Sequence, residues 1–101
     1  MSRVRFAPKA LADVDRIDTW WQANRPAAPN LFSAELTSAL ALLRESPAIG
    51  TPYAAPTRLP VRRLLLLDTQ VHVYYRLNEV TGSVVILRVW SVRRGRGPAL
   101  H

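Results

Sequence analysis

The start of the chain joins an alternating segment to an amphipathic one. Within residues 2–7, Val4 and Phe6 fall on one side and Arg3 and Arg5 on the other, which is the period of a half-buried strand. Pro8 can begin a helix, because the N–H that proline lacks has no partner in the first turn. Apolar residues then recur every three or four positions and predict a helix ending near residues 24–26: Ala10, Leu11, Val14, Ile17 and Trp21.

A second amphipathic helix follows after a short link. Its first residue is ambiguous within residues 26–30, which contain two prolines, and Pro47 prevents its continuation. Two helices joined by so short a link are expected to pack as antiparallel neighbours. The apolar stripe of the second helix consists of Phe32, Leu36, Ala39, Leu40, Leu42 and Leu43.

The second half of the chain has the pattern of strands. Residues 46–60 are rich in proline and predict an irregular crossover. Strands are predicted at 61–67, 70–77 and 84–92, separated by turns. In the last of them we expect Val85, Leu87 and Val89 to face inward and Arg88 and Trp90 to face outward. Residues 93–101, with their glycines and proline, predict a basic tail or an edge loop.

The order β-α-α-β-β-β predicts an α+β fold in which a helical hairpin covers one face of a sheet. The other face is then open to solvent or to a partner. Of the adjacent Arg62 and Arg63, at most one can join that face. Cations interleaved with aromatic rings form surfaces that hold phosphates and stack bases. By alternation, the residues of this kind on the open face are Arg3, Arg5, His72, Tyr74, Arg76, Arg88 and Trp90.

Length and charge limit the number of domains and indicate the kind of partner. A chain of 101 residues has room for one domain. Residues 1–50 carry six basic and five acidic side chains, whereas residues 51–101 carry eight basic and two acidic ones. Thirteen of the fourteen cations are arginine, which suits phosphates and carboxylates. An acidic partner is therefore expected, either a nucleic acid or an acidic protein segment.

Several classes of chemistry find no support. The absence of cysteine excludes a disulfide framework and thiolate sites, and no apolar run reaches the roughly 18 residues that a membrane span needs, so we expect a cytoplasmic protein. No nucleotide-binding or zinc motif is present, so we expect no cofactor and no metal. Asp13, Asp15 and Asp18 are expected on a solvated or partner-binding helix face. Trp21 continues the apolar stripe, and Trp20 is expected to fill the seam against the crossover or a partner.

Taken in order, these segments resemble the RelE/ParE toxin superfamily of type II toxin-antitoxin systems. The resemblance spans nearly the whole chain. It implies an antiparallel four-stranded sheet of order 1-4-3-2 packed on the hairpin, and a cognate antitoxin with an acidic helix that wraps the toxin. The segments that carry it are residues 10–14 with Trp20 and Trp21, residues 32–50, and the motifs Val61-Arg62-Arg63-Leu64, Val73-Tyr74-Tyr75-Arg76 and Ile86-Leu87-Arg88-Val89-Trp90, followed by Arg93, Arg94 and Pro98.

One activity in the superfamily is that of a ribosome-dependent mRNA endonuclease. Such chemistry needs a base for the 2′-hydroxyl and cations for the developing charge. His72 is the one side chain with a suitable pKa on the right face, and Arg76 and Arg88 could supply charge. Lys9 is the sole lysine, however, and the last residues hold His101 but no tyrosine, whereas many nuclease members have a tyrosine there.

The other main activity is inhibition of DNA gyrase, as in ParE-like members, without hydrolytic chemistry of their own. The end of the last strand resembles that side of the superfamily, and we favour it. A further alternative is a non-toxic basic module that binds nucleic acid or protein. For target binding we predict Arg3, Arg5, Tyr74, Arg76, Arg88, Trp90, Arg93, Arg94 and Arg96.

Overall fold

A computed structural model describes residues 2–55 and 59–100, which leaves His101 of the sequence analysis and part of the predicted crossover, residues 56–58, outside the described residues. The helical hairpin and the strands form where the hydrophobic pattern predicts them, and one further strand lies in the crossover. Within the described residues, no helix is long and apolar enough to span a membrane. The elements are β1 (Val4–Phe6), α1 (Pro8–Asn24), α2 (Leu31–Glu45), β2 (Thr51–Tyr53), β3 (Val61–Leu66), β4 (Val71–Leu77), β5 (Val84–Ser91) and the 3₁₀ helix η1 (Val92–Arg94).

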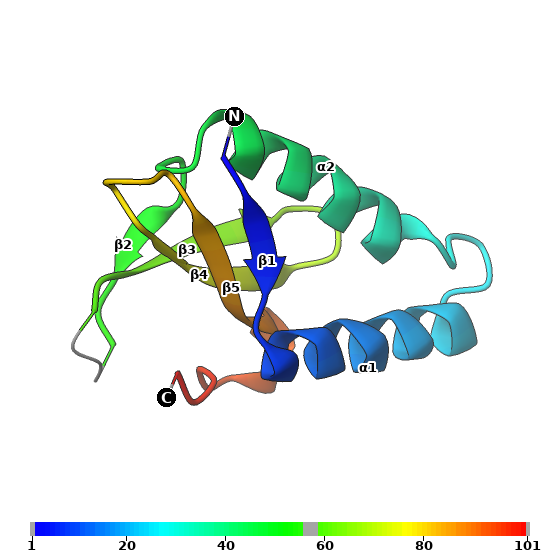
Figure 1. Ribbon diagram of the computed structural model, residues 1–101. Helices are drawn as coiled ribbons and strands as arrows, with labels where there is room; N and C mark the ends of the chain where they lie inside the picture. Colours follow the sequence, from blue (N-terminus) through cyan, green and yellow to red (C-terminus); the bar gives the residue numbers. More distant parts are fainter. Residues whose placement is uncertain (1, 56–58, 101) are drawn as a thin grey trace.

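The strands form one sheet of order β1-β5-β4-β3-β2 (Figure 1). The expected order 1-4-3-2 is retained in β1-β5-β4-β3, and β2 extends it to five strands by pairing with the start of β3. The sheet is mixed, since β1 runs parallel to β5 while the other pairs are antiparallel. Parallel neighbours need a long crossover connection, and here the two helices and β2–β4 separate β1 from β5 in the chain.

Both helices lie on one face of the sheet (Figure 1). The core between the two layers contains the predicted stripes of both helices, including Ile17, Trp21, Phe32 and Leu43. Leu42 departs from its predicted stripe and is 41% exposed. The helices therefore bury the aliphatic side of the sheet, as the alternation in β4 predicts.

Of the three β5 residues expected to face inward, Val85 and Leu87 do not, and only Val89 does. A register shift opposite Tyr74 and Tyr75 places Ile86 beside Tyr75 and Arg88 beside Tyr74. Such a β-bulge adds a residue to one strand and reverses the phase of the alternation. Val84, Ile86 and Val89 are consequently the core residues, whereas Leu87 packs on the opposite face. Arg88 and Trp90 stay outward, because they lie beyond the bulge.

The expectation of an open second face also needs correction. After η1 the chain turns back along this face, and the Trp90 Nε1 donates a hydrogen bond to the Arg96 carbonyl at 2.7 Å. Leu100 is 7% exposed and packs with Val61, Tyr74 and Trp90 in a second apolar cluster. The predicted tail thus forms part of the folded domain and covers the centre of the face.

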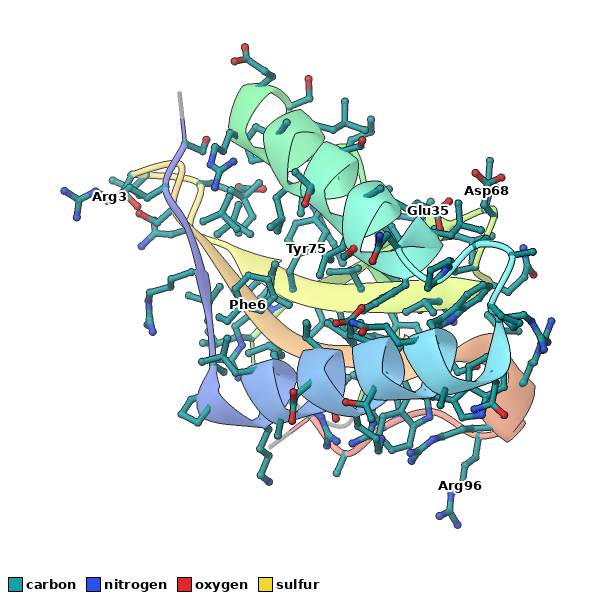
Figure 2. All side chains as sticks on the ribbon, turned by 90° about the vertical axis from the view of Figure 1, so that its right-hand side faces the viewer. Arg3, Phe6, Glu35, Asp68, Tyr75 and Arg96 are labelled. Atoms are coloured by element: carbon teal, nitrogen blue, oxygen red, sulfur yellow. The ribbon has the colours of Figure 1, made fainter. Side chains whose placement is uncertain are left out.

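A buried polar contact holds the α2–β2 crossover to the sheet. The Tyr75 hydroxyl donates to the Pro47 carbonyl and accepts from the Gly50 N–H, both at 2.8 Å, and Figure 2 shows Tyr75 between α2 and the sheet. Arg62 donates to the Ala48 and Gly50 carbonyls on the same side. A Cβ atom at Gly50 would lie 2.6 Å from the Tyr75 hydroxyl. Close approach to this ring therefore requires glycine at position 50.

Gly50→Ala is expected to lower the free energy of unfolding by about 1–3 kcal/mol through overpacking. Tyr75→Phe is expected to cost a similar amount, because it leaves the Gly50 N–H and the Pro47 carbonyl unpaired. In the double variant the added methyl still meets the ring carbon Cε1, at 2.7 Å, but no longer the hydroxyl at 2.6 Å. The two single costs should therefore sum to somewhat more than the loss measured in the double variant. Urea unfolding of the four proteins tests this, and strict additivity would contradict it.

A second polar contact fixes the β3–β4 turn to α2. The Glu35 carboxylate accepts hydrogen bonds from the Asp68 and Thr69 N–H groups and from the Thr69 hydroxyl, at 2.6–2.9 Å. Figure 2 shows Glu35 and Asp68 side by side at this end of the molecule. The chain then passes through Gln70 at φ 57°, a conformation that costs energy outside glycine and is supported here by these contacts.

Candidate functional site

In the part of β5 that extends past β1, a side chain of α1 bonds directly to the strand. Because β1 pairs only with residues 84–86, the N–H of Val89 has no strand partner on that side. Asp13 of α1 accepts this hydrogen bond at 3.0 Å, and it also accepts two from Arg88, at 2.7 and 2.9 Å. Arg16, one helical turn on, adds a contact of 3.0 Å to the same carboxylate. One carboxylate thus holds α1 to the unpaired edge of β5.

This ion pair is withdrawn from water. The side chain of Asp13 is 1% exposed and that of Arg88 is 14% exposed. Burial raises the pKa of Asp13, but the hydrogen bonds from Arg88, Val89 and Arg16 outweigh burial and leave the pKa below its ordinary value. The hydrogen bonds that Arg88 donates to Asp13 raise the pKa of Arg88 above its ordinary value. Both groups are therefore charged at neutral pH.

Two expectations from the sequence are corrected by this arrangement. Asp13 is not on a solvated helix face: the carboxylate lies on the inner side of α1, where a charge is stable only with partners. Arg88 does face away from the core, but its guanidinium is turned to Asp13 and to the Ala99 carbonyl. The sequence offered no signal for this pair, since Asp13 and Arg88 are 75 positions apart.

A polar cavity of about 210 Å³ lies on the second face, next to the returning tail. His72 and Tyr74 of β4 and Arg63 of β3 contribute to its walls, and Arg96 and Gly97 close it. The rings of His72 and Tyr74 are 5.9 Å apart, and the Arg63 guanidinium stacks 4.9 Å from the ring of Tyr53. Tyr53 and Arg63 are site residues that the sequence analysis missed, because β2 was not predicted and only one of the adjacent Arg62 and Arg63 could be assigned.

The cavity keeps its histidine neutral. Burial lowers the pKa of His72, and the nearby positive charge of Arg63 lowers it further. Burial also raises the pKa of Tyr74. A neutral imidazole can accept a proton, so His72 and Arg63 together could deprotonate one group and hold an anion. Neither Arg76 nor Arg88 lines this cavity, so the expected trio with His72 is not brought together there.

The other predicted cations are spread over the molecule. Arg3 and Arg96 project from opposite ends (Figure 2). Arg5 is exposed on β1, and its register partner Val85 is also the partner of Arg76 on β4. Tyr74 and Trp90 are 2% and 9% exposed, beneath the tail. The expectation that these residues converge on one bare surface is therefore wrong.

A second hollow lies at the end of α1. It has a volume of about 300 Å³ and is lined by residues of α1, the β3–β4 turn, the end of β5 and η1, namely Arg16, Ile17, Trp20, Trp21, Thr69, Val71, Ser91, Arg93 and Arg94. Arg93 and Arg94 thus line a hollow on the helix side, and the Arg94 guanidinium also lies 4.1 Å from the ring of Trp90. Trp20 is 42% exposed, so it does not fill a seam inside the chain. We refer to this hollow as the α1–η1 groove.

A comparison with known protein families identifies the family of this chain. The model of the ParE toxin of the type II toxin-antitoxin system parDE matches residues 4–95. The chain belongs to the ParE toxin family. The resemblance to the RelE/ParE superfamily is thereby confirmed, and the chain is a toxin of a type II toxin-antitoxin system. No curated protein matches the sequence.

Solved structures share the fold of this ParE-family toxin. A chain of the chromosomal ParDE system from P. aeruginosa aligns with a TM-score of 0.70 at 20% identity, covering 90% of this chain and 96% of that one. A chain of the toxin-antitoxin complex RelBE2 from Mycobacterium tuberculosis gives 0.59 at 23% identity, with 89% and 96% covered. A chain of the archaeal RelE-RelB complex from Pyrococcus horikoshii gives 0.61 at 17% identity, with 95% and 98% covered.

Within this ParE-family toxin, the described residues contain no group of three or more histidine, cysteine or acidic side chains that could hold a metal ion. Two sites could take part in function. One cavity holds a neutral histidine beside an arginine, and the α1–η1 groove holds exposed arginines near tryptophans. The first arrangement resembles a proton-transfer site, and the second resembles a recognition surface.

Proposed function

We propose that this toxin inhibits growth through a ParE-like action on DNA gyrase and that a cognate antitoxin neutralises it in the cytoplasm. The match to the ParE family over residues 4–95 supports the proposal most directly. The Asp13–Arg88 ion pair adds to it, because one of the two arginines predicted to supply charge in a nuclease is neutralised by a buried carboxylate. The residues predicted for target binding that remain exposed are Arg3, Arg5, Arg93, Arg94 and Arg96.

A ribosome-dependent endonuclease is the second candidate, and one observation favours it. His72 has a lowered pKa and lies in the same cavity as Arg63 and Tyr74. A base of this kind next to a cation suits attack of a 2′-hydroxyl on phosphate. Against it, the tyrosine beside His72 is poorly suited to act as the acid: Tyr74 is 2% exposed, and burial raises its pKa. A non-toxic basic module remains the third candidate.

The purified toxin is expected to inhibit gyrase-catalysed supercoiling of relaxed plasmid in a concentration-dependent manner. In the same preparation, mRNA incubated with programmed ribosomes should stay intact. Cleaved mRNA with unimpaired supercoiling would instead support the nuclease. No effect in either assay, together with normal growth after induction, would favour the binding module.

His72→Ala separates the two toxic activities. For a gyrase inhibitor we expect growth arrest to be unchanged, whereas removal of a general base lowers a cleavage rate by about 10²–10⁴-fold. Glu79→Ala is a suitable control, since Glu79 is exposed in the turn after β4 and does not line the cavity. The measurement is colony formation after induction, with protein levels followed by immunoblot. Loss of arrest in His72→Ala alone would contradict the gyrase proposal.

A further inference from the structure

The cavity on the second face of the sheet carries positive charge that no carboxylate balances. Among the described residues that line it, two are arginine and none is acidic. Within the part of the chain that the structure describes, the ion pairs are those of Asp13 with Arg16 and Arg88, so the half-buried Arg63 has no carboxylate partner. A charge that water solvates only in part is stabilised by a counter-ion.

Aromatic rings hold the Arg63 side chain in the wall of this cavity. Its guanidinium stacks 4.9 Å from the ring of Tyr53, and the ring of Tyr53 packs edge-on against that of Tyr74 at the same distance. A guanidinium stacked in this way still presents its N–H groups at its edge. Those N–H groups can form two parallel hydrogen bonds to an oxyanion.

The neighbouring side chains add hydrogen-bond donors. Burial raises the pKa of Tyr74, although a hydrogen bond from Arg63 acts in the opposite direction, so the hydroxyl keeps its proton at neutral pH. The ring of His72 lies 5.9 Å from that of Tyr74, and a neutral imidazole retains one N–H group. An anion in the cavity would therefore meet a cation and several donors together.

The returning tail forms the outer wall of the cavity. Gly95, Arg96 and Gly97 line it on this side, and the Arg96 carbonyl is held by the Trp90 indole N–H at 2.7 Å. A Cβ atom at Gly97 would lie 2.9 Å from the Tyr53 hydroxyl, so the tail backbone passes close to this ring. A ligand in the cavity would contact the sheet and the tail at once.

The size of the cavity favours a small anion over a nucleic acid strand. Its volume of about 210 Å³ equals that of roughly seven water molecules at about 30 Å³ each, which is enough for a phosphate group. A nucleic acid strand needs a continuous groove and free aromatic faces. Here the tail covers the face, and Tyr74 and Trp90 are only 2% and 9% exposed.

We propose that the cavity on the second face binds a phosphate group, as the free ion or as a phosphate monoester, and that the bound group holds the tail, residues 95–100, closed over the sheet. Arg63 supplies the charge and the paired N–H donors. The hydroxyls of Tyr53 and Tyr74 and the imidazole of His72 supply further hydrogen bonds. Because the ligand binds the closed tail, binding and closure are linked.

The first test is an NMR titration of the full-length toxin with inorganic phosphate, at an ionic strength held constant with chloride. The imidazole C–H signals are followed, and His72→Gln assigns them because the chain has two histidines. We expect a saturable shift of the His72 signal with phosphate and none with chloride alone. The absence of a saturable shift would overturn the proposal.

Arginine variants identify the charge that binds. Arg63→Gln should weaken phosphate binding by about tenfold or more, and Arg63→Lys, which keeps the charge but not the forked donors, should recover part of the affinity. Arg44→Gln, at an exposed arginine near the end of α2, should stay within about twofold. Circular dichroism verifies that each variant is folded. Equal affinities of Arg63→Gln and Arg44→Gln would overturn the proposal.

The second test measures closure of the tail. The chain contains no cysteine, so a thiol introduced by Leu100→Cys, at a position that is 7% exposed, is labelled only when the tail opens. Phosphate at ten times its dissociation constant should slow this labelling by about tenfold. Leu67→Cys, at a leucine that is 72% exposed, should be labelled at an unchanged rate. A rate at position 100 that ignores phosphate would contradict the linkage and overturn the proposal.

The unmodified toxin provides a check that needs no cysteine. Its thermal midpoint should rise with the concentration of phosphate at constant ionic strength, and that of Arg63→Gln should not. A rise of equal size in both proteins would show that phosphate acts elsewhere, and the proposal would fail.

The same assays separate the sources of the phosphate group. Tighter binding of adenosine 5′-monophosphate than of inorganic phosphate, with the same slowing at position 100, identifies a monoester, and the reverse order identifies the free ion. A single-stranded oligonucleotide that binds and accelerates labelling at position 100 would show that the face holds nucleic acid, and the proposal would fail. The assays contain neither gyrase nor ribosomes, so their outcome is independent of the proposed action on gyrase.

Discussion

Replacing Asp13 by alanine is expected to lower the free energy of unfolding by about 3–5 kcal/mol, the cost of breaking a buried ion pair. The substitution leaves Arg88, whose side chain is 14% exposed, without its carboxylate, and it leaves the Val89 N–H unpaired at the edge of the sheet. Domains of this size have only about 5–15 kcal/mol of stability in total. Denaturant unfolding followed by tryptophan fluorescence measures the change.

Asp15→Ala provides the control. Asp15 lies on the same helix with its side chain exposed, so its removal should change the stability by no more than about 0.5 kcal/mol. Equal effects of the two substitutions would show that the buried pair does not hold α1 to β5. Asp13→Asn, which keeps the shape but removes the charge, should fall between the two because it can still accept from Val89.

The same ion pair predicts how stability depends on pH. The pKa of Asp13 is lowered in the folded state, so its contribution is fully present above the unfolded value of about 3.9 and is lost as the pH falls below it through the folded value. The difference between the unmodified toxin and Asp13→Ala should therefore be constant near neutral pH. It should shrink below about pH 4.

The Asp13–Arg88 ion pair also determines what a loss of toxicity means in arginine variants. From the sequence, Arg76→Ala and Arg88→Ala are equivalent tests of a basic surface. In the structure Arg88→Ala leaves Asp13 as an uncompensated buried charge, so loss of growth arrest in that variant would report unfolding. Arg76 is not part of the pair, and Arg76→Ala is the informative test of target binding.

The parts of the fold that follow from local pattern could be predicted. The apolar spacing of Ile17 and Trp21 placed α1, the alternation of Val71 and Val73 placed β4, and both lie in the core as expected. These signals are local, because each depends only on the period of one element. The resemblance to the superfamily supplied the order of the strands.

What could not be predicted depends on contacts between distant residues. The position of Asp13 inside the protein depends on the free edge of β5, which exists only because β1 is short. The bulge beside Leu87 is invisible in a run of apolar residues, where either phase satisfies the pattern. Trp20 and Arg93 come together through tertiary packing across the chain. The candidate site was thus less predictable than the fold.

Leu100→Ala is expected to destabilise the domain by about 2 kcal/mol or more, because the side chain is buried against Val61, Tyr74 and Trp90. Removing residues 96–100 should cost more. It also deletes the carbonyls of Arg96 and Ala99, which accept hydrogen bonds from Trp90 at 2.7 Å and Arg88 at 3.2 Å. Leu67→Ala is the control, since Leu67 is 72% exposed in the β3–β4 turn.

Tryptophan fluorescence reports on the second face of the sheet, where Trp90 lies beneath the tail. Loss of the tail transfers the Trp90 indole to water, so the tryptophan emission of the folded truncated protein should shift to longer wavelength. Its unfolding midpoint should also fall. A tail that is only a solvated basic extension would leave both unchanged. In that case Leu100→Ala and Leu67→Ala would be indistinguishable, and residues 96–100 would be free to contact the target instead of completing the fold.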